Sequence, residues 1–476
     1  MGNIQKIKLG VVPTRREDLN FPVKLAMDQK IPLFNKLREM EIDFVDLDDV
    51  CSDGLLVSLD DLEAAKKKFT DHRIDALFIP TIVFGAEGPV SLLAKEMGVP
   101  TLLWGPRDPE GRGATGKAGL GIYTIGKSLR RLGVPFTFMG TCSVEDRLFE
   151  EGLRMFLAAA NVVKEMKNSR ILQIGPRPES FWSVIVDEGM LMEKLGIPVY
   201  PIALPELFDE FEAVMANEEA RIAQIVEDFK RRTVIRTNSE IVKKSAAMAI
   251  TLENLTRYTH SNAVAVQCWH AMPKQLGIWP CAGGALLAES GVPVACEGDV
   301  YGAVSCIIAQ AASRKGEKPI FMDYDGVHPE NPNAFNVHHC AISPIEYYED
   351  TPRMFRRPNP PEKDWGGCIS GELRTKGDVS FLRFDGDRGE YSVLVGKGKA
   401  VKGPAAASGN SFGWYEVEDW QKLEYILSTG PYIHHGVIIY DDILVPVHEA
   451  CKYLDMKADF AFDSEKKYAE SFMYTL

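Results

Sequence analysis

VPVACEGDVYGAVSCIIAQAASRKGEKPIFMD, residues 292–323, is the stretch that decides the fold class. Two apolar runs flank a segment of helical spacing, and each run ends on a carboxylate, Glu297 or Asp323. Strands covered on both faces have near-continuous apolar sequences, so the stretch predicts a βαβ unit. A right-handed crossover places both carboxylates at one edge of one sheet, which is where open α/β sheets bind ligands.

The same alternation of apolar runs and helical segments occupies most of the chain. It predicts strands at 6–12, 43–47, 75–82, 100–105, 169–177, 197–202, 263–269, 292–297, 319–323 and 334–339. After residue 356, short alternating segments broken by glycine are typical of antiparallel structure. We therefore expect an α/β protein with two open parallel-sheet domains, residues 1–169 and 170–345. A smaller antiparallel β-rich, barrel-like domain is expected at 346–476.

Composition excludes several classes of partner. The 476 residues include 54 basic and 67 acidic side chains, a net charge of −13, which repels nucleic acid and anionic lipid. No apolar run is long enough to span a membrane, and residues 1–15 lack the apolar core of a signal peptide. Nine cysteines lie singly along the chain, which is typical of a reducing compartment. We expect a cytoplasmic protein with no nucleic-acid or membrane partner.

Candidate metal ligands come from two residue types. Two carboxylates held together repel each other unless a cation lies between them or one keeps a proton. The chain also has two adjacent histidine pairs, His338-His339 and His434-His435, and strand geometry lets at most one of each pair face a common site. Carboxylates with imidazoles suit Mn²⁺, Mg²⁺ or Co²⁺. The structural alternative is that Glu297 caps the following helix and Asp323 opens a turn.

Other polar residues follow predicted strands. Gln267 and Trp269 close the strand at 263–269, and an aromatic ring beside an amide is a common sugar-binding surface, although a core tryptophan fits equally well. Arg15 and Arg16 end the first strand, and Arg107 follows the fourth. These arginines are candidates for an anion or substrate contact; otherwise they are solvated charges.

A second class of enzyme competes with this interpretation. GIYTIGKS, residues 121–128, fits the P-loop pattern of nucleotide-binding proteins. However, Ile122, Ile125 and Leu129 recur at helical spacing and the nearest predicted strand ends well upstream, so we expect an amphipathic helix. A P-loop enzyme stays as one alternative, and a non-catalytic sugar-binding protein with two α/β lobes as another.

With GVPVACEGDVYGA, PIFMDYD, NVHHCAISP and YIHHGVII in this order, the sequence resembles the L-fucose isomerase and L-arabinose isomerase superfamily. The resemblance implies two α/β domains, a C-terminal β domain and aldose–ketose isomerisation with a divalent metal, usually Mn²⁺. It also implies a homo-oligomer, trimer to hexamer, with active sites near subunit boundaries.

Residue by residue, the resemblance suggests that Glu297 and Asp323 bind the metal and move protons. His435 or its neighbour His434 is similar to the distant imidazole ligand, and His338 to the additional histidine of the arabinose branch. Gln267 and Trp269 match a substrate-facing segment only loosely.

The reaction implied is isomerisation of an open-chain sugar through a cis-enediol. A neutral 6-deoxy aldose or a pentose is the expected substrate. The alternative is a hexose with an anionic group at C6, such as a 6-sulfonated sugar, because Arg15, Arg16 and Arg107 have the fork geometry that suits an oxyanion.

Overall fold

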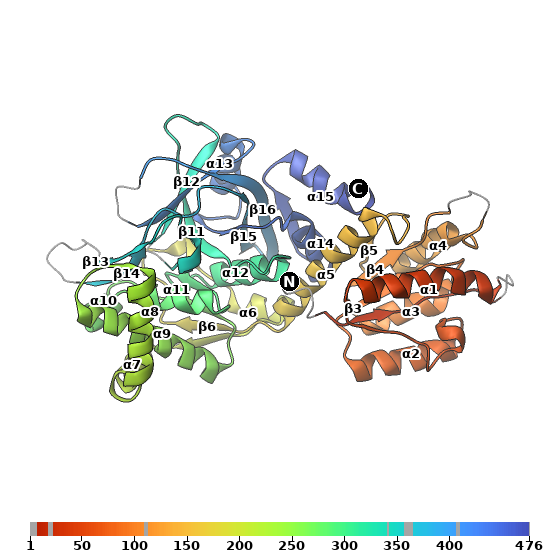
Figure 1. Ribbon diagram of the computed structural model, residues 1–476, viewed down its shortest axis with the longest axis horizontal. Helices are drawn as coiled ribbons and strands as arrows, with labels where there is room; N and C mark the ends of the chain where they lie inside the picture. The colour runs from red at the N-terminus through yellow and green to blue at the C-terminus, as the bar shows by residue number, and fades with distance from the viewer. Residues whose placement is uncertain are drawn as a thin grey trace.

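The computed structural model describes residues 7–17, 22–108, 113–339, 342–356, 365–405 and 410–475. Figure 1 shows an N-terminal α/β unit on the right, a central α/β unit at the lower left, and a β-barrel above the central unit. The predicted α/β class with an antiparallel barrel-like C-terminal region is confirmed. Within the described residues, no helix combines the length and apolar character needed to cross a membrane.

The N-terminal unit contains a five-stranded parallel sheet in the order β2-β1-β3-β4-β5. Its strands are β1 (Leu9–Val11), β2 (Phe44–Val45), β3 (Ala76–Pro80), β4 (Thr101–Trp104) and β5 (Thr137–Phe138). Its helices are α1 (Val23–Glu39), α2 (Leu59–His72), α3 (Glu87–Met97), α4 (Ala118–Arg131) and α5 (Arg147–Lys167). The strand order reverses at β1, and such a switch point is where open sheets bind ligands. Of these five strands, only β5 was not predicted.

Helix α4 decides between the two interpretations of residues 121–128. The whole motif lies inside this helix, with Ile122, Ile125 and Leu129 buried against the N-terminal sheet. A P-loop needs an open turn whose backbone N–H groups face a phosphate, and in the interior of a helix those groups are already bonded. The predicted amphipathic helix is confirmed.

The central unit contains a four-stranded parallel sheet in the order β10-β9-β6-β7. Its strands are β6 (Ile171–Ile174), β7 (Val199–Ile202), β9 (Ala263–Val266) and β10 (Val294–Cys296). The helices are α6 (Glu188–Met190), α7 (Leu204–Asn217), α8 (Glu219–Arg232), α9 (Ser239–Thr259), α10 (Ala271–Leu276), α11 (Cys281–Glu289) and α12 (Val300–Ala312). A small sheet combines β8 (Val234–Arg236), β13 (Arg353–Arg356) and β14 (Gly366–Ser370).

The barrel is a ring of six antiparallel strands in the order β15-β18-β11-β12-β17-β16, closed by pairing of β15 with β16. The strands are β11 (Ile320–Val327), β12 (Ala334–His339), β15 (Asp378–Asp387), β16 (Glu390–Val401), β17 (Ser411–Glu416) and β18 (His435–Ile439). Strand β19 (Lys457–Phe460) adds to β16 in parallel. Helices α13 (Trp420–Thr429), α14 (Leu444–Leu454) and α15 (Asp463–Thr475) complete the chain.

Strands β11 and β12 correct one prediction. Their apolar sequences suggested membership of the central parallel sheet, but they pair antiparallel with β18 and β17 in the barrel. The first half of β11 is buried on both faces, so it lacks the alternation that marks an antiparallel strand. The local sequence pattern therefore predicted the two strands correctly but assigned them to the wrong sheet.

A buried polar contact joins the N-terminal sheet to α14. The hydroxyl of Thr137 on β5 donates to Glu449 Oε2 at 2.6 Å and lies 2.8 Å from the hydroxyl of Tyr453. Tyr453 in turn donates to the carbonyl of Thr101 at the start of β4, at 3.0 Å. The two hydroxyl protons are directed to Glu449 and to the Thr101 carbonyl, and these hydrogen bonds tie α14 to this edge of the sheet.

Candidate metal and active site

Glu297 follows directly on β10 in a tight left-handed turn. Its φ is 63° and that of Gly298 is 69°, a conformation that costs a residue with a side chain about 1–2 kcal/mol. The carboxylate is buried, and Oε1 accepts a hydrogen bond from Trp269 Nε1–H at 2.9 Å. The strained turn thus presents Oε2 on the far side of the carboxylate from Trp269.

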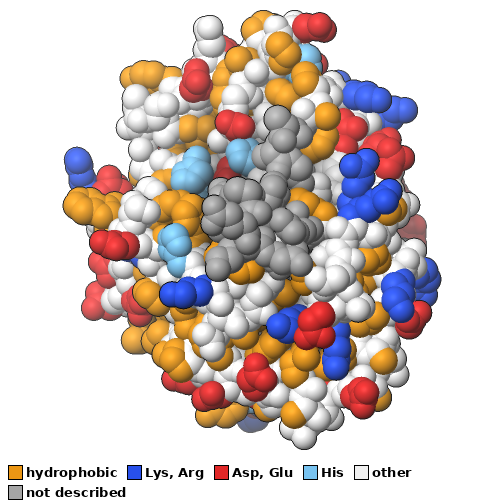
Figure 2. Space-filling model, turned by 90° about the vertical axis from the view of Figure 1, so that its left-hand side faces the viewer, with side chains coloured by type: hydrophobic (Ala, Val, Ile, Leu, Met, Phe, Trp, Pro, Cys, Tyr) orange, Lys and Arg blue, Asp and Glu red, His pale blue; other side chains and the backbone are white. Residues whose placement is uncertain are grey.

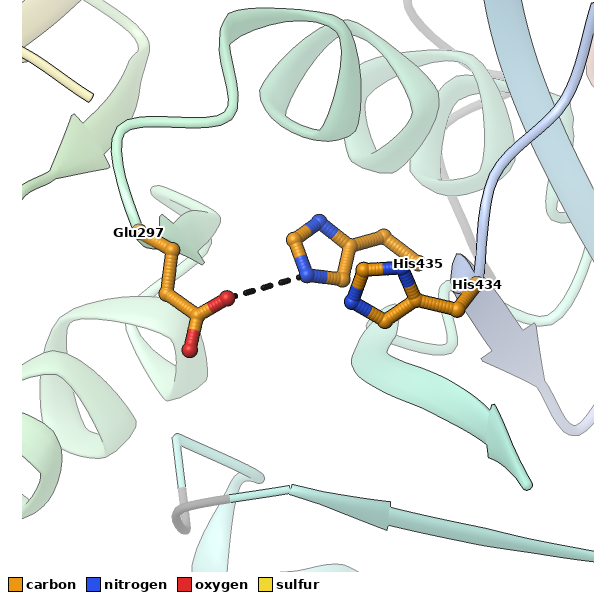
Figure 3. A group of neighbouring side chains, drawn as sticks. All are labelled: Glu297, His434 and His435. Carbon is orange, nitrogen blue, oxygen red and sulfur yellow. Dashed lines mark hydrogen bonds and ion pairs between the residues drawn. The ribbon is translucent and has the colours of Figure 1, made fainter. Parts of the chain in front are cut away.

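His435, the first residue of β18, is the buried centre of the cluster. Its Nε2 lies 3.1 Å from Glu297 Oε2, and Figure 3 shows the two side chains directed toward each other from separate segments. Its Nδ1 lies 2.8 Å from Asp299 Oδ2. Asp323 stands opposite His435 in the β11–β18 register, with Oδ1 at 3.6 Å from Nε2.

The expectation that Glu297 and Asp323 share one sheet edge is wrong. Glu297 leaves the central sheet, whereas Asp323 lies on a barrel strand. After β10, α12 leads the chain to the barrel and not back to the central sheet. The carboxylates approach the same imidazole because the barrel packs its β11–β18 edge against the carboxyl end of β10.

Histidines supply two overlapping groups of possible ligands. Glu297, His434 and His435 form one group and Asp323, His339 and His435 the other, with the ligand atoms of each group within 4.8 Å of one another. His434 and His435 both contribute, contrary to strand alternation, because His434 precedes the first residue of β18. Figure 2 looks at the left-hand side of Figure 1 and shows several histidine side chains close together on that face.

The structure places His339, and not His338, in these groups. His339 Nε2 lies 3.6 Å from Asp323 Oδ1, and the side chain is buried. His338 Nδ1 lies 3.3 Å from Asp325 Oδ2, and its Nε2 is 4.0 Å from Asp323 Oδ2. His338 stands opposite Asp323 in the β11–β12 register, yet its side chain is 31% exposed and that of His339 only 1%. Which of two adjacent histidines is buried cannot be read from the pair itself.

Burial and charge act on these groups in opposite directions. Burial lowers the pKa of His435, but hydrogen bonds with Asp299 and Glu297 outweigh it and raise the pKa to about 9. For Glu297, burial raises the pKa, yet the hydrogen bond with His435 and the charge of His339 hold it below its usual value. Asp323 has a pKa raised to about 7 by burial, which the charge of His435 opposes and that of Glu297 reinforces.

The donor set fits a divalent cation. Asp323 Oδ1 is buried and has no hydrogen-bond partner among the described residues, although His339 Nε2 and His435 Nε2 both lie 3.6 Å away. These separations are too long for hydrogen bonds and leave room for an ion between the three atoms. Carboxylate oxygens with imidazole nitrogens are ligands that Mn²⁺ accepts.

Comparison with known proteins agrees with this chemistry. A family model described as "Fucose/sulfoquinovose isomerase, N-terminal domain" matches residues 10–167. A sulfoquinovose isomerase of Priestia aryabhattai is 23% identical over 412 residues, which cover 86% of this chain and 90% of that protein. Another, of Alkalicoccus urumqiensis, is 25% identical over 362 residues, covering 75% and 79% of the two chains. The chain belongs to the fucose isomerase-like superfamily. Within that superfamily it is an aldose–ketose isomerase.

Similarity to solved structures is weak. A periplasmic solute-binding protein from Actinobacillus succinogenes 130z with bound D-allose aligns at a TM-score of 0.17 and 10% identity, over 60% of this chain and 83% of that one. A similarity this low carries no argument about the fold or the activity of the isomerase.

Aromatic side chains enclose one side of the cluster in this fucose isomerase-like protein. Trp269 packs edge-on against Phe181, with ring centroids 5.3 Å apart, and Phe181 lies 6.4 Å from the ring of His435. Gln267 follows β9, and its Oε1 is buried with no hydrogen-bond partner among the described residues. The structure thus places Gln267 and Trp269 near the carboxyl ends of the central strands, and it adds Phe181, whose loop gave no sequence signal.

The three predicted arginines lie elsewhere. Arg15 forms an ion pair with Glu17 at 3.6 Å, and Arg16 forms one with Glu87 at 3.5 Å. Arg107 pairs with Asp146 at 2.8 Å. All three follow strands of the N-terminal sheet at its carboxyl edge, and Figure 1 places this unit at the opposite end of the isomerase from the face in Figure 2. Among the described residues of one chain, these arginines are not brought to the candidate metal cluster.

Proposed function

We propose that this isomerase interconverts the aldose and ketose forms of a hexose with an anionic group at C6, of the sulfoquinovose class. The observation that carries the proposal is the convergence of Glu297, Asp323 and His435 on one buried point. The sulfoquinovose isomerases similar along most of the chain favour a C6-anionic sugar over a neutral one. A neutral 6-deoxy aldose or pentose is the second candidate, in keeping with the fucose branch.

The proposed cofactor is Mn²⁺, with Mg²⁺ or Co²⁺ as substitutes. Glu297, Asp323 and His435 would hold the ion, with His339 and His434 as further ligands on either side. Such an ion polarises the carbonyl of an open-chain sugar and acidifies the adjacent C–H bond. Hydrogen bonds with Trp269 and His435 orient the Glu297 carboxylate, and a cation held between Glu297 and Asp323 would favour the ionised form of both.

Glu297 and Asp323 would perform the proton transfers. One carboxylate removes the proton from C2 of the aldose and delivers it to C1, while the other moves the hydroxyl proton from O2 to O1; the cis-enediol lies between these steps. Trp269 fixes one oxygen of Glu297, which leaves the other oxygen for the proton. Phe181 and Trp269 shield this side of the site, and exclusion of water limits exchange of the transferred proton.

A second copy of the chain is proposed to supply the anion-binding arginines. Arg15 and Arg16 stand at the switch point of the N-terminal sheet, where such folds bind ligands. Glu17 and Glu87, with which they form ion pairs, belong to the N-terminal unit and not to the cluster. A homo-oligomer, trimer to hexamer, in which one N-terminal unit covers the cluster of a neighbour would bring the two halves of the site together.

Turnover of a matched sugar pair tests the proposed substrate. We expect sulfoquinovose to be isomerised in the presence of Mn²⁺ and not in the presence of a chelator. The neutral 6-deoxyglucose, which differs only at C6, should turn over far more slowly. Efficient turnover of the neutral sugar alone would assign the protein to the second candidate.

Complementation between two inactive variants tests the shared site. Arg16→Ala and Glu297→Gln damage different halves, so mixed oligomers formed by co-expression should contain some intact sites. We expect activity in the mixture well above that of either variant alone. Activity no higher than the sum of the separate variants would contradict a site shared between copies.

We also propose a cytoplasmic location. Cysteines 51, 142, 268, 306, 368 and 451, all in the described part of the chain, are buried free thiols. Free thiols persist in a reducing compartment.

A further inference from the structure

Asp299 occupies a position behind the metal-binding cluster that no metal ligand role explains. It is the N-cap residue of α12, where its Oδ1 accepts the backbone N–H of Gly302 at 2.8 Å. Its Oδ2 lies 2.8 Å from Nδ1 of His435, on the side of the ring away from Glu297 and Asp323. Asp299 is 1% exposed and His435 is fully buried, so water does not compete for this contact.

Arg383 on β15 holds Asp299 in turn. Its guanidinium is fully buried and donates from both terminal nitrogens to the two oxygens of Asp299. Its Nε donates to Asp385 Oδ2 at 2.9 Å.

We propose that Asp299, oriented by Arg383, is a positioning residue that keeps the proton of His435 on Nδ1 and so leaves Nε2 available as a metal ligand. Both ring nitrogens face a carboxylate, which only accepts hydrogen bonds, so each nitrogen can carry a proton. A metal ion would displace the proton on Nε2, and Asp299 would retain the one on Nδ1. An imidazole that binds a metal through one nitrogen commonly donates the other N–H to such a carboxylate, which fixes both the tautomer and the ring plane. The inference rests on the proposed metal dependence.

Asp299→Asn and Asp385→Asn form a matched pair of test variants. Asparagine is as good an N-cap residue as aspartate, so α12 keeps its cap. Its amide group, however, can donate toward Nδ1 and favours the tautomer with the proton on Nε2. Asp385 is similarly buried and contacts the same arginine, but within the described residues no hydrogen bond or ion pair joins it to His435. Both variants disturb Arg383, and only the first disturbs the imidazole.

Binding of Mn²⁺ alone to the full-length protein, followed by the EPR signal of the free ion, gives the readout without turnover. We expect Asp299→Asn to weaken Mn²⁺ binding about 10- to 100-fold, the usual effect of losing such a partner, and Asp385→Asn to change it less than about threefold. In a His435→Gln background, adding Asp299→Asn should weaken binding no further. Equal Mn²⁺ affinity of folded Asp299→Asn and wild type would overturn the inference.

A measurement on the unaltered protein covers the case in which Asp299→Asn does not fold. The protein is labelled with ¹⁵N at its histidines, loaded with diamagnetic Mg²⁺ and studied by NMR. The His435 signals are identified by their loss in His435→Gln, and they should show a proton on Nδ1. A proton on Nε2 would contradict the inference. Wild-type protein that binds neither Mn²⁺ nor Mg²⁺ would instead refute the metal dependence itself, so the two failures are distinct.

Discussion

His435 Nε2 lies 3.1 Å from Glu297 Oε2, although 138 residues separate the two in the chain. The contact joins the carboxyl end of the central parallel sheet to the first residue of a barrel strand. The barrel by itself brings together Asp323, His339 and His435, whereas the group with Glu297 depends on how the barrel packs on the central unit.

Replacing Glu297 by Gln should reduce turnover of a competent substrate about 10²- to 10⁴-fold, because the amide neither accepts a proton nor carries a charge. The amide oxygen can still accept the Trp269 hydrogen bond, so the fold is expected to persist and circular dichroism should be unchanged. Steady-state kinetics of the purified variant gives the result. Normal turnover would exclude Glu297 from the proton transfers.

The two histidines of β12 should differ in their effect on metal binding. His339→Gln removes a buried nitrogen that faces Asp323 Oδ1, so Mn²⁺ affinity should fall by about tenfold or more. His338→Gln, its immediate neighbour and therefore its control, should change that affinity little, because its ring faces Asp325. Titration with Mn²⁺ measures both, and the reverse order would restore His338 as the ligand.

Stability should fall as pH rises, through Glu465 in α15. The side chain is buried, and burial raises its pKa from 4.5 to about 7 although Oε1 accepts the Lys397 N–H at 2.6 Å. The unfolded chain releases this proton near pH 4.5 and the folded chain near 7, so the ionised form destabilises the fold above that window.

Urea unfolding of wild type and Glu465→Gln at pH 5 and pH 8 checks this pH effect. Relative to the variant, wild type should lose about 2–3 kcal/mol of unfolding free energy between the two pH values. Glu470→Gln, on the exposed side of the same helix, should behave as wild type. Parallel pH dependence of wild type and Glu465→Gln would show that Glu465 does not carry the effect.

Thr137→Val should weaken the junction between the N-terminal sheet and α14. Valine has the shape of threonine but leaves Glu449 and Tyr453 without the shared hydroxyl, which costs about 1–3 kcal/mol in a buried site. Chemical denaturation measures the loss. The control Thr70→Val changes an exposed threonine on α2 and should stay within about 0.5 kcal/mol of wild type. An equal, small effect of both substitutions would mean that the junction contributes little.

Much of the fold could be predicted from local sequence. Apolar runs located the N-terminal and central strands, and helical spacing distinguished α4 from a P-loop. The assignment of β11 to a sheet could not be predicted, because a strand buried on both faces has the same sequence pattern in a barrel and in a parallel sheet.

Some residues of the candidate site could likewise be predicted from the sequence, and others could not. Glu297, Asp323 and His435 follow from residue type and order, and the structure brings them together. Arg383 had no sequence signal, because a single arginine in a barrel strand looks like any exposed charge until its burial is known. The choice between His338 and His339 could not be predicted, because it depends on which of the two side chains is buried, and the adjacent pair does not show this.

The order of strands around the barrel bears on how the chain is made in the cell. Strand β18, residues 435–439, pairs with both β11 and β15, which lie far ahead of it in the chain. During synthesis, β11 and β15 leave the ribosome with open edges, and unpaired edges are prone to aggregate. A truncation before residue 435 removes both the strand that joins them and the central imidazole. We therefore expect incomplete chains to lack activity and to aggregate through their unpaired strand edges. Chaperones and proteases act on chains of this kind.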